Sequence, residues 1–306
     1  MYYLGEATQA GVARALGMSR TTVSRLLSED RRCGIVRIEV VPPAGDDDVA
    51  GRLAQRLGLR AVHLGSPGHM GAGSPLSPAL AAALTGVGLA PQDVLLVSCS
   101  RTLYEAAQGD LPTLSRVRVV PMVGGPEEPE AWCHTNEITR QVAAKVGGSP
   151  AFLYAPAMPS PELWERLVED SATRQVFELW ARARCAVVGV GAPPRARDSL
   201  PSFVARDPGL LRHAVGDVCY HFYSLDGGRV PFPGCERLMA IGEQALRALP
   251  ASIGVAAGFD KVPSIIGAAR AGYLTDLVTD GATAAALLLE LDDMPPRRSG
   301  AGRARD

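Results

Sequence analysis

The chain lacks any apolar run long enough to cross a membrane. A spanning helix needs about 20 consecutive apolar residues, and charged residues, Gly or Pro interrupt every candidate segment. A basic leader followed by an apolar stretch and a cleavage site is missing too, so we expect the protein to stay in the cytoplasm. With 306 residues, of which 47% are hydrophobic and 21% charged, the chain is expected to be globular and to form more than one domain.

Motifs for disulfides, metals and common catalytic sites are also missing. The six cysteines are dispersed without a CxxC pair, so we expect reduced, mostly buried thiols. The five histidines show no metal-ligand spacing such as HxxxH or HExxH. No GxSxG elbow, P-loop or intact GxGxxG follows a predicted strand. We therefore expect no metal, no cofactor and no catalytic residue.

The net charge of −1 excludes a chain that is basic throughout, but the charge is unevenly distributed. Between Arg14 and Arg37 there are six arginines and only two acidic residues, Glu29 and Asp30, which gives this segment a net charge of +4. A local basic face on a near-neutral chain is typical of a DNA-binding head attached to a larger body with another task.

The segment TQAGVARALGMSRTTVSRLL, from Thr8 to Leu27, has the residue types of a helix-turn-helix. Apolar residues stand where two short helices bury side chains against each other: Val12, Leu16, Met18, Val23 and Leu26. Ala13 falls where the helices cross, and Gly17 falls at the turn, where a left-handed backbone favours glycine. Ser19 can cap the second helix. An ordinary helical hairpin is the alternative, but all these positions agree jointly with the DNA-binding motif.

The second helix of this motif has a polar outer face, as expected of a helix that lies in the major groove. A strand over residues 35–40 follows it and would form a wing, and Pro42, Pro43 and Gly45 then break regular structure. We therefore predict a winged helix-turn-helix domain over residues 1–44. The candidate DNA contacts are Arg14, Ser19, Arg20, Thr21, Thr22, Ser24, Arg25, Arg31, Arg32 and Arg37.

Beyond residue 45, strand-like and helix-like segments alternate, which predicts an α/β domain with a mainly parallel, Rossmann-like sheet over residues 45–295. The expected strands are 61–64, 94–98, 117–122, 151–154, 186–190, 253–256 and 274–279. A first helix is expected to begin at Asp46–Asp48 and to end at Gly58. Further helices are expected over 78–84, 102–108, 137–146, 161–181, 242–249, 263–271 and 282–291. A hairpin with an Asp226-Gly227 turn is expected within residues 217–230, and residues 296–306 are expected to form a disordered tail.

Two loops suggest an anion site. Arg101 follows the strand over 94–98, and Lys261 follows the strand over 253–256. Each places a cation near the first turn of a helix, where the helix dipole disfavours positive charge, and a bound anion would remove this conflict. The alternative is that both side chains point into water. Glycines follow two other strands, at Gly124-Gly125 and at Gly189–Gly191. They add turns at the same edge of the sheet where a ligand can approach the backbone closely.

Sequence blocks along the chain resemble the SorC family of bacterial sugar-sensing transcription regulators. The similarity covers about residues 2–291, and the order of the blocks makes it specific. After the N-terminal motif, the blocks are SRTLYEAA, VVPMVGG, Asn136-Glu137 before a helix ending in VGG, AVVGVG, AVGDVCYHFYSLDGG and GVAAGFDKVPSIIGAARAGYLTDLVTDGATAAALL.

The resemblance implies an effector domain like the NagB, RpiA and CoA-transferase folds, a phosphorylated sugar or related metabolite as inducer, and a tetramer or dimer of dimers. It implies phosphate contacts at Ser100, Arg101, Thr102 and Lys261. The remaining effector pocket would be lined by Gly124, Gly125, Asn136, Asp217, Arg237 and Gly258. There are two departures: the family usually has Trp-Gly where this chain has Cys99-Ser100, and this chain begins partway through the family's first helix.

We therefore expect a DNA-binding regulator of a carbohydrate-metabolism operon that is controlled by a phosphorylated sugar or related anionic metabolite. The alternative is an isomerase- or deaminase-like enzyme on phosphosugars that carries an incidental N-terminal hairpin. An enzyme of that kind needs an acid or base beside the anion site, and the sequence shows no convincing one.

Replacing Arg20 or Arg25 with Ala should weaken operator binding by about 1–3 kcal/mol if the replaced side chain makes a bidentate base contact. Both arginines stand on the polar face opposite Val23 and Leu26. Fluorescence anisotropy at fixed salt measures the change, and unchanged binding in both variants would contradict the assignment.

Overall fold

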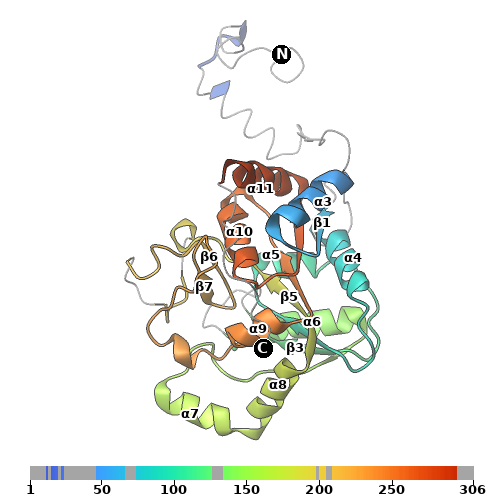
Figure 1. Cartoon of the computed structure of the whole chain (residues 1–306), viewed down its shortest axis with the longest axis vertical. Coiled ribbons are helices and arrows are strands. Elements are labelled where there is room, and N and C mark those ends of the chain that lie inside the picture. The colour runs from blue at the N-terminus through green and yellow to red at the C-terminus, as the bar shows by residue number, and fades with distance from the viewer. Residues whose placement is uncertain are drawn as a thin grey trace. The chain divides into compact units, whose positions relative to one another are not determined.

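The computed structural model describes residues 12, 15–19, 22–23, 46–65, 74–125, 134–197, 200–204 and 209–294 (Figure 1). By its contacts the chain divides into two compact units, residues 1–43 and 44–306. Several predicted features lie outside the described residues: the wing over 35–40, the tail over 296–306, and Ala13, Arg14, Arg20, Thr21, Ser24, Arg25, Leu26, Arg31, Arg32 and Arg37.

A parallel sheet forms the centre of the second unit. Among the described residues it has seven strands in the order β1-β9-β8-β5-β2-β3-β4, all paired in parallel. The strands are β1 (Ala61–Gly65), β2 (Val94–Val97), β3 (Arg118–Pro121), β4 (Ser149–Pro150), β5 (Ala183–Gly189), β8 (Ala251–Val255) and β9 (Asp276–Asp280). The predicted α/β class with a mainly parallel sheet is therefore confirmed.

Helices cover both faces of this sheet, because its central strands are apolar on both sides. Leu96 packs into one core with α3, α8, α10 and α11, whereas Leu95 and Val97 pack into another core with α4, α5 and α6. The helices are α3 (Asp46–Leu57), α4 (Ser77–Val87), α5 (Arg101–Ala106), α6 (Thr135–Val146), α7 (Pro161–Glu169), α8 (Ser171–Ala181), α9 (Glu243–Ala248), α10 (Val262–Arg270) and α11 (Gly281–Asp293), with short 3₁₀ turns η2 (Pro194–Ala196), η3 (Cys235–Arg237) and η4 (Phe259–Lys261).

Two expected elements differ in the structure. The strand expected over 151–154 is wrong, since β4 ends at Pro150 and the Asn136 side chain instead bonds both backbone groups of Leu153 at 3.0 and 3.1 Å. The single helix expected over 161–181 is also wrong. Asp170 stands between α7 and α8 in an extended conformation, and its carboxylate accepts a 2.8 Å hydrogen bond from Thr173 N, which caps α8.

A small hairpin stands beside the sheet. It pairs β6 (Gly216–Val218) with β7 (His221–Tyr223) in antiparallel fashion. The two turn residues between these strands, Cys219 and Tyr220, have φ values of 50° and 65°, as a two-residue hairpin turn of this hand requires. The predicted turn at Gly227 is present as well and joins β7 to Arg229 through an isolated antiparallel bridge. Residues 217–230 therefore contain two turns instead of the single turn expected from the sequence.

Of the predicted helix-turn-helix, the structure describes residues 12, 15–19 and 22–23. Val12 and Val23 are buried as predicted, and Gly17 has a φ of 65°. The Ser19 hydroxyl accepts a 3.1 Å hydrogen bond from Thr22 N, so the predicted helix cap is confirmed. Leu16 and Met18, however, are 53% and 45% exposed in this single chain, and their predicted burial is wrong. Leu16 is the last helical residue before the turn at Gly17, and Met18 lies in the turn region before the Ser19 cap.

Along the described part of the chain, no helix is both long and apolar enough to cross a membrane. The four cysteines within it, Cys99, Cys185, Cys219 and Cys235, are free thiols.

Substituting Gly227 by Ala should lower the free energy of unfolding by at least about 2 kcal/mol. Gly227 has a φ of 83°, which costs an L-residue about 1–2 kcal/mol, and an added Cβ would overlap the backbone of Arg270 and Ala271. Gly51→Ala is the matched control: Gly51 lies within α3 with open space around it, so this change should stabilise by about 0.5–1 kcal/mol. Urea unfolding measures both, and equal stability of the two variants would contradict the argument.

Candidate effector site

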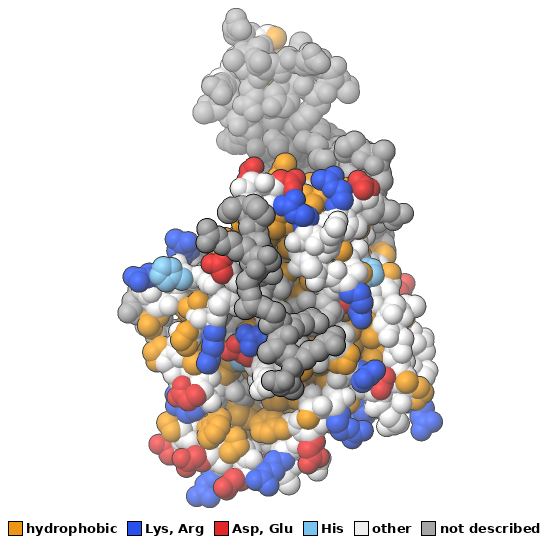
Figure 2. All heavy atoms as spheres, viewed as in Figure 1, with side chains coloured by type: hydrophobic (Ala, Val, Ile, Leu, Met, Phe, Trp, Pro, Cys, Tyr) orange, Lys and Arg blue, Asp and Glu red, His pale blue; other side chains and the backbone are white. Residues whose placement is uncertain are grey.

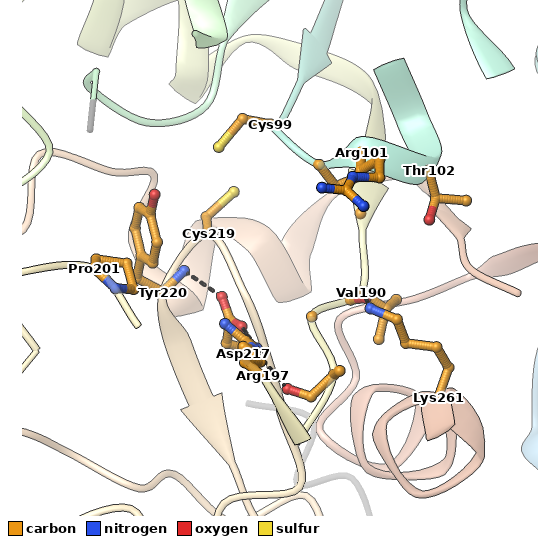
Figure 3. A pocket seen from close by; sticks show the side chains of 14 residues that line it. Cys99, Arg101, Thr102, Val190, Arg197, Pro201, Asp217, Cys219, Tyr220 and Lys261 are labelled. Atoms are coloured by element: carbon orange, nitrogen blue, oxygen red, sulfur yellow. Dashed lines mark hydrogen bonds and ion pairs between the residues drawn. The ribbon is translucent and has the colours of Figure 1, made fainter. Parts of the chain in front are cut away.

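A cavity of about 340 Å³ lies at the carboxyl ends of β2, β5 and β8, three neighbouring strands of the sheet. The hairpin β6–β7 closes one side of it (Figure 3). The lining residues are Cys99, Ser100, Arg101, Thr102, Gly189, Val190, Gly191, Ala192, Arg197, Pro201, Asp217, Cys219, Tyr220 and Lys261. Ligands of open parallel sheets bind at this edge, and the volume is within the range of small-molecule pockets.

The loop after β2 is held against the end of β5. The Ser98 hydroxyl accepts a 2.8 Å hydrogen bond from Gly189 N, and Ser100 caps α5 by accepting one of 3.1 Å from Leu103 N. The Ser100 hydroxyl therefore serves as the N-cap of α5. Arg101 and Thr102, the first residues of α5, lie beside the cavity (Figure 3).

Lys261 enters the cavity from the turn η4 just before α10, and its ammonium group donates a 2.8 Å hydrogen bond to the carbonyl oxygen of Val190. Burial lowers the pKa of this ammonium group below its usual 10.5, and the positive charge of Arg197 lowers it further. The carboxylates of Asp217 and Asp260 act in the opposite direction but do not reverse the shift. Within the described residues no carboxylate pairs directly with Lys261, so its charge is incompletely compensated.

Arg197 and Asp217 form an ion pair at the cavity wall. Their side chains are only 18% and 9% exposed, so this pair lies in a largely desolvated position. Arg197 Nε also donates to the carbonyl oxygen of Ala192 at 2.8 Å, and Asp217 accepts a 2.9 Å hydrogen bond from Tyr220 N. Asp217 thereby fixes both the arginine and the hairpin turn.

Glycines after β5 allow these side chains to approach. A Cβ at Gly189 would overlap the Ser100 side chain, and a Cβ at Gly191 would overlap Asp217 and Arg197. The predicted close-approach turn at 189–191 thus packs against side chains that line the cavity.

Two thiols also face this space. Burial raises the pKa of Cys99 to about 11 and raises that of Cys219 well above its ordinary value. Both groups therefore remain neutral thiols at physiological pH and act as small apolar surfaces.

The structure gathers only part of the predicted effector site. Ser100, Arg101, Thr102, Asp217 and Lys261 line the cavity. The other five predicted residues are not among those that line it: Gly124, Gly125, Asn136, Arg237 and Gly258.

Four of these five residues have contacts that stabilise the fold. Gly124 packs against the carbonyl groups of Ala155 and Pro156, where a Cβ would stand 2.6 Å from the first oxygen. Gly125 N donates to Ala155 O at 2.9 Å, and Asn136 bonds the backbone of Leu153. Gly258 has a φ of 119° and donates from its backbone N to Thr283 Oγ1 at 2.8 Å.

Arg237, the fifth, lies beside Gly234, and its Nε is buried without a partner among the described residues. Arg197 and Tyr220 also line the cavity, although neither was predicted from the sequence. Arg197 stands in a Pro-rich loop without a motif. It belongs to the site because the fold brings it into an ion pair with Asp217, which lies 20 residues later in the chain. No group of three or more metal-ligating side chains occurs in the described ranges.

Comparisons with known proteins agree with this architecture. Residues 41–289 match the family described as "Putative sugar-binding domain". The sorbitol operon regulator of Klebsiella pneumoniae is 31% identical over 300 residues, covering 94% of this chain and 95% of that protein. The deoxyribonucleoside regulator of Bacillus subtilis (strain 168) is 31% identical over 303 residues, covering 95% and 96%.

Solved structures show the same fold. The full-length sorbitol operon regulator SorC from Klebsiella pneumoniae superposes with a TM-score of 0.70 at 31% identity, covering 94% of this chain and 96% of that one. A transcriptional regulator from Streptococcus pneumoniae TIGR4 has the fold at 22% identity, with a TM-score of 0.70 over 80% of this chain and 97% of that one.

The parallel sheet, the matched sugar-binding domain and these relatives define a DNA-binding transcription regulator. The chain belongs to the SorC family. It is a regulator of sugar metabolism rather than an enzyme, so the alternative of a phosphosugar isomerase is set aside.

Lys261 should titrate below 10.5, because burial and Arg197 lower the pKa of its ammonium group. The chain contains only two lysines, Lys145 and Lys261, so ¹³C-dimethylated protein gives few NMR signals and Lys261→Met identifies the relevant one. Because the folded-state pKa lies below the unfolded value, the free energy of unfolding should rise as pH increases through the folded pKa towards 10.5. This rise should vanish in Lys261→Met, and a Lys261 pKa at or above 10.5 would contradict the argument.

Proposed function

We propose that the cavity binds a phosphorylated sugar or related anionic metabolite and that this ligand controls operator binding. The observation that carries the proposal is the charge of the cavity wall. Among the described residues that line it, three are cationic, Arg101, Arg197 and Lys261, and one, Asp217, is a carboxylate. Since Arg197 already pairs with Asp217, an anion is needed to balance Lys261 in its buried position.

The remaining wall suits the rest of a sugar. Asp217 offers carboxylate oxygens as acceptors for hydroxyl groups, and Thr102 adds a hydroxyl beside Arg101. Tyr220 and Cys219 supply a less polar side. The names of the relatives support a sugar-like ligand, since one is a sorbitol operon regulator and another is a deoxyribonucleoside regulator.

The DNA contacts are proposed at the second helix of the helix-turn-helix. Its start is ordered by the Ser19 cap, and Val23 is buried, which leaves the opposite face for DNA. Arg20, Thr21, Thr22 and Arg25 would contact base edges or nearby phosphates. A wing and flanking arginines would hold the DNA backbone, namely Arg14, Arg31, Arg32 and Arg37 with the support of Ser19 and Ser24.

We propose a homo-oligomer, either a dimer or a tetramer, that acts in the cytoplasm on operator DNA. One short recognition helix gives too few base contacts for specific affinity, so two copies are needed on half-sites about 10–10.5 base pairs, or a multiple of this, apart. The ligand acts by binding one arrangement of the heads and bodies more tightly than the other, because only differential affinity shifts such an equilibrium.

Calorimetric titration with a panel of sugar phosphates and their unphosphorylated counterparts tests the effector site. Phosphorylated members should bind, and Lys261→Met should weaken binding at least tenfold, because a hydrogen bond to a charged group contributes about 1.5–3 kcal/mol. Lys145→Met is the matched control: Lys145 Nζ also donates to backbone carbonyls, those of Gln108 and Gly109 at 2.8 and 2.9 Å, but lies outside the cavity.

Equal affinity of wild type and Lys261→Met for a ligand on this panel would contradict the site. The confirmed ligand is then added to an operator titration by fluorescence anisotropy at fixed salt. A ligand that binds the protein without changing operator affinity would contradict the proposed control.

A further inference from the structure

Helix α7 carries large apolar side chains without burying any residue. It contains Leu163, Trp164 and Leu167, of which Leu163 is 43% exposed while the other two pack only partly against the core. Figure 2 shows hydrophobic side chains gathered at the lower end of the view, where Figure 1 labels α7, with charged side chains around them. An exposed apolar group of this kind with a polar rim is typical of an interaction surface.

A projecting ring and a cavity lie next to each other on this surface. Tyr154 is 80% exposed, with its ring centroid 6.1 Å from that of Phe152. Beside it lies a cavity of about 240 Å³ lined by Phe152, Leu153, Tyr154, Leu167, Asp170, Ala172 and Thr173. Its volume exceeds that of an engineered cavity of roughly 150 Å³ that takes up benzene, so it can accept an aromatic ring.

A surface that carries both a projecting ring and a hollow is complementary to itself. In a two-fold symmetric pair, residue i of one copy faces residue j of the other and the reverse holds as well. Tyr154 of each copy can therefore enter the hollow of its partner. Within a single chain Tyr154 forms part of the rim of this hollow without filling it, and its side chain remains 80% exposed.

The charges of α7 have the same self-complementarity. Glu162 and Arg166 are exposed and stand one helical turn apart on the same face of α7. When two α7 helices run antiparallel across a two-fold axis near Trp164, Glu162 of one copy faces Arg166 of the partner subunit, and the pair repeats on the other side of the axis. Leu163 shares a side of α7 with Leu167, which lines the hollow, so it flanks these charge pairs and joins them to the hollow.

From these features we infer that two copies of this chain associate through α7 and the neighbouring Tyr154 hollow. The inference rests on the proposed homo-oligomer and names its surface. Nucleic acid does not fit this surface, because Glu162, Glu165 and Glu169 outnumber Arg166 along the helix.

Sedimentation of the full chain tests the surface. Leu163→Glu and Tyr154→Ala should each shift the assembly to half its mass at concentrations where the wild type is fully associated. Leu289→Glu is the matched control, since Leu289 is 70% exposed on α11, away from this surface, and its replacement should leave the mass unchanged. Circular dichroism and thermal unfolding show that each variant is folded.

Exchanged charges test the two-fold arrangement itself. Glu162→Arg alone and Arg166→Glu alone each place like charges opposite each other twice, so each should dissociate roughly tenfold more readily than the wild type. An equimolar mixture of the two variants should restore association, because every contact between unlike copies then joins an arginine to a glutamate. The like-charge pair within each helix stays the same in the mixture, so only the contact between chains explains a recovery.

The outcomes separate this surface from the proposed function. A wild-type oligomer whose mass is unchanged in Leu163→Glu and Tyr154→Ala overturns the α7 surface and leaves an oligomeric regulator in place. Failure of the mixed charge variants to associate better than either alone overturns the two-fold arrangement. A wild-type monomer that binds its operator specifically overturns both the surface and the proposed homo-oligomer, while effector binding by calorimetry remains a separate measurement.

Discussion

Parallel hydrogen bonding among β2, β5 and β8 is the constraint on which the cavity depends. Val187 of β5 is in register with Val97 on one side and with Ile253 on the other, so the three strands end near one another. Since all three run in the same direction, their following loops emerge at one edge. Arg101 and Lys261, which are 160 residues apart in the chain, reach a common cavity for this reason alone.

This arrangement buries charged side chains, and the structure pairs only some of them with an opposite charge. The Arg197–Asp217 pair is internally balanced and well hydrogen-bonded, so removing either partner would leave the other as an uncompensated buried charge. Lys261 has only a carbonyl oxygen as its hydrogen-bond acceptor among the described residues, and its lowered pKa expresses the resulting cost. Ligand affinity and proton affinity at this site are therefore linked, because an anion that stabilises the ammonium form also raises its pKa.

The sequence predicted those features that follow from local pattern. Continuous apolar runs such as 94–97 identify strands that are buried on both faces, and their alternation with helices yields the parallel sheet. The turn at Gly17 and the cap at Ser19 follow from residue type at fixed spacing. Two cations after strand ends led to the prediction of an anion site at the loops after β2 and β8. These loops do line one cavity, and the anion site itself stays a prediction.

What the sequence did not predict depends on contacts between distant segments. The apolar run over 151–154 is typical of a strand, but the side chain of Asn136 takes the backbone groups of Leu153 and ends the pairing. Asp170 is compatible with a continuous helix in composition, yet as a cap it divides α7 from α8. Arg197 is one of many arginines in polar loops, and only the folded hairpin that carries Asp217 distinguishes it.

The glycines at 189 and 191 also determine how this regulator can diverge. Any side chain at either position would overlap groups that line the cavity, so the wall formed by the end of β5 tolerates no variation without loss of its neighbours. The facing wall, with Cys99, Pro201 and Tyr220, presents side chains that can change in size one at a time. Descendants of this gene that acquire a new effector are therefore expected to keep the glycines after β5 and to carry their substitutions in the wall formed by Cys99, Pro201 and Tyr220.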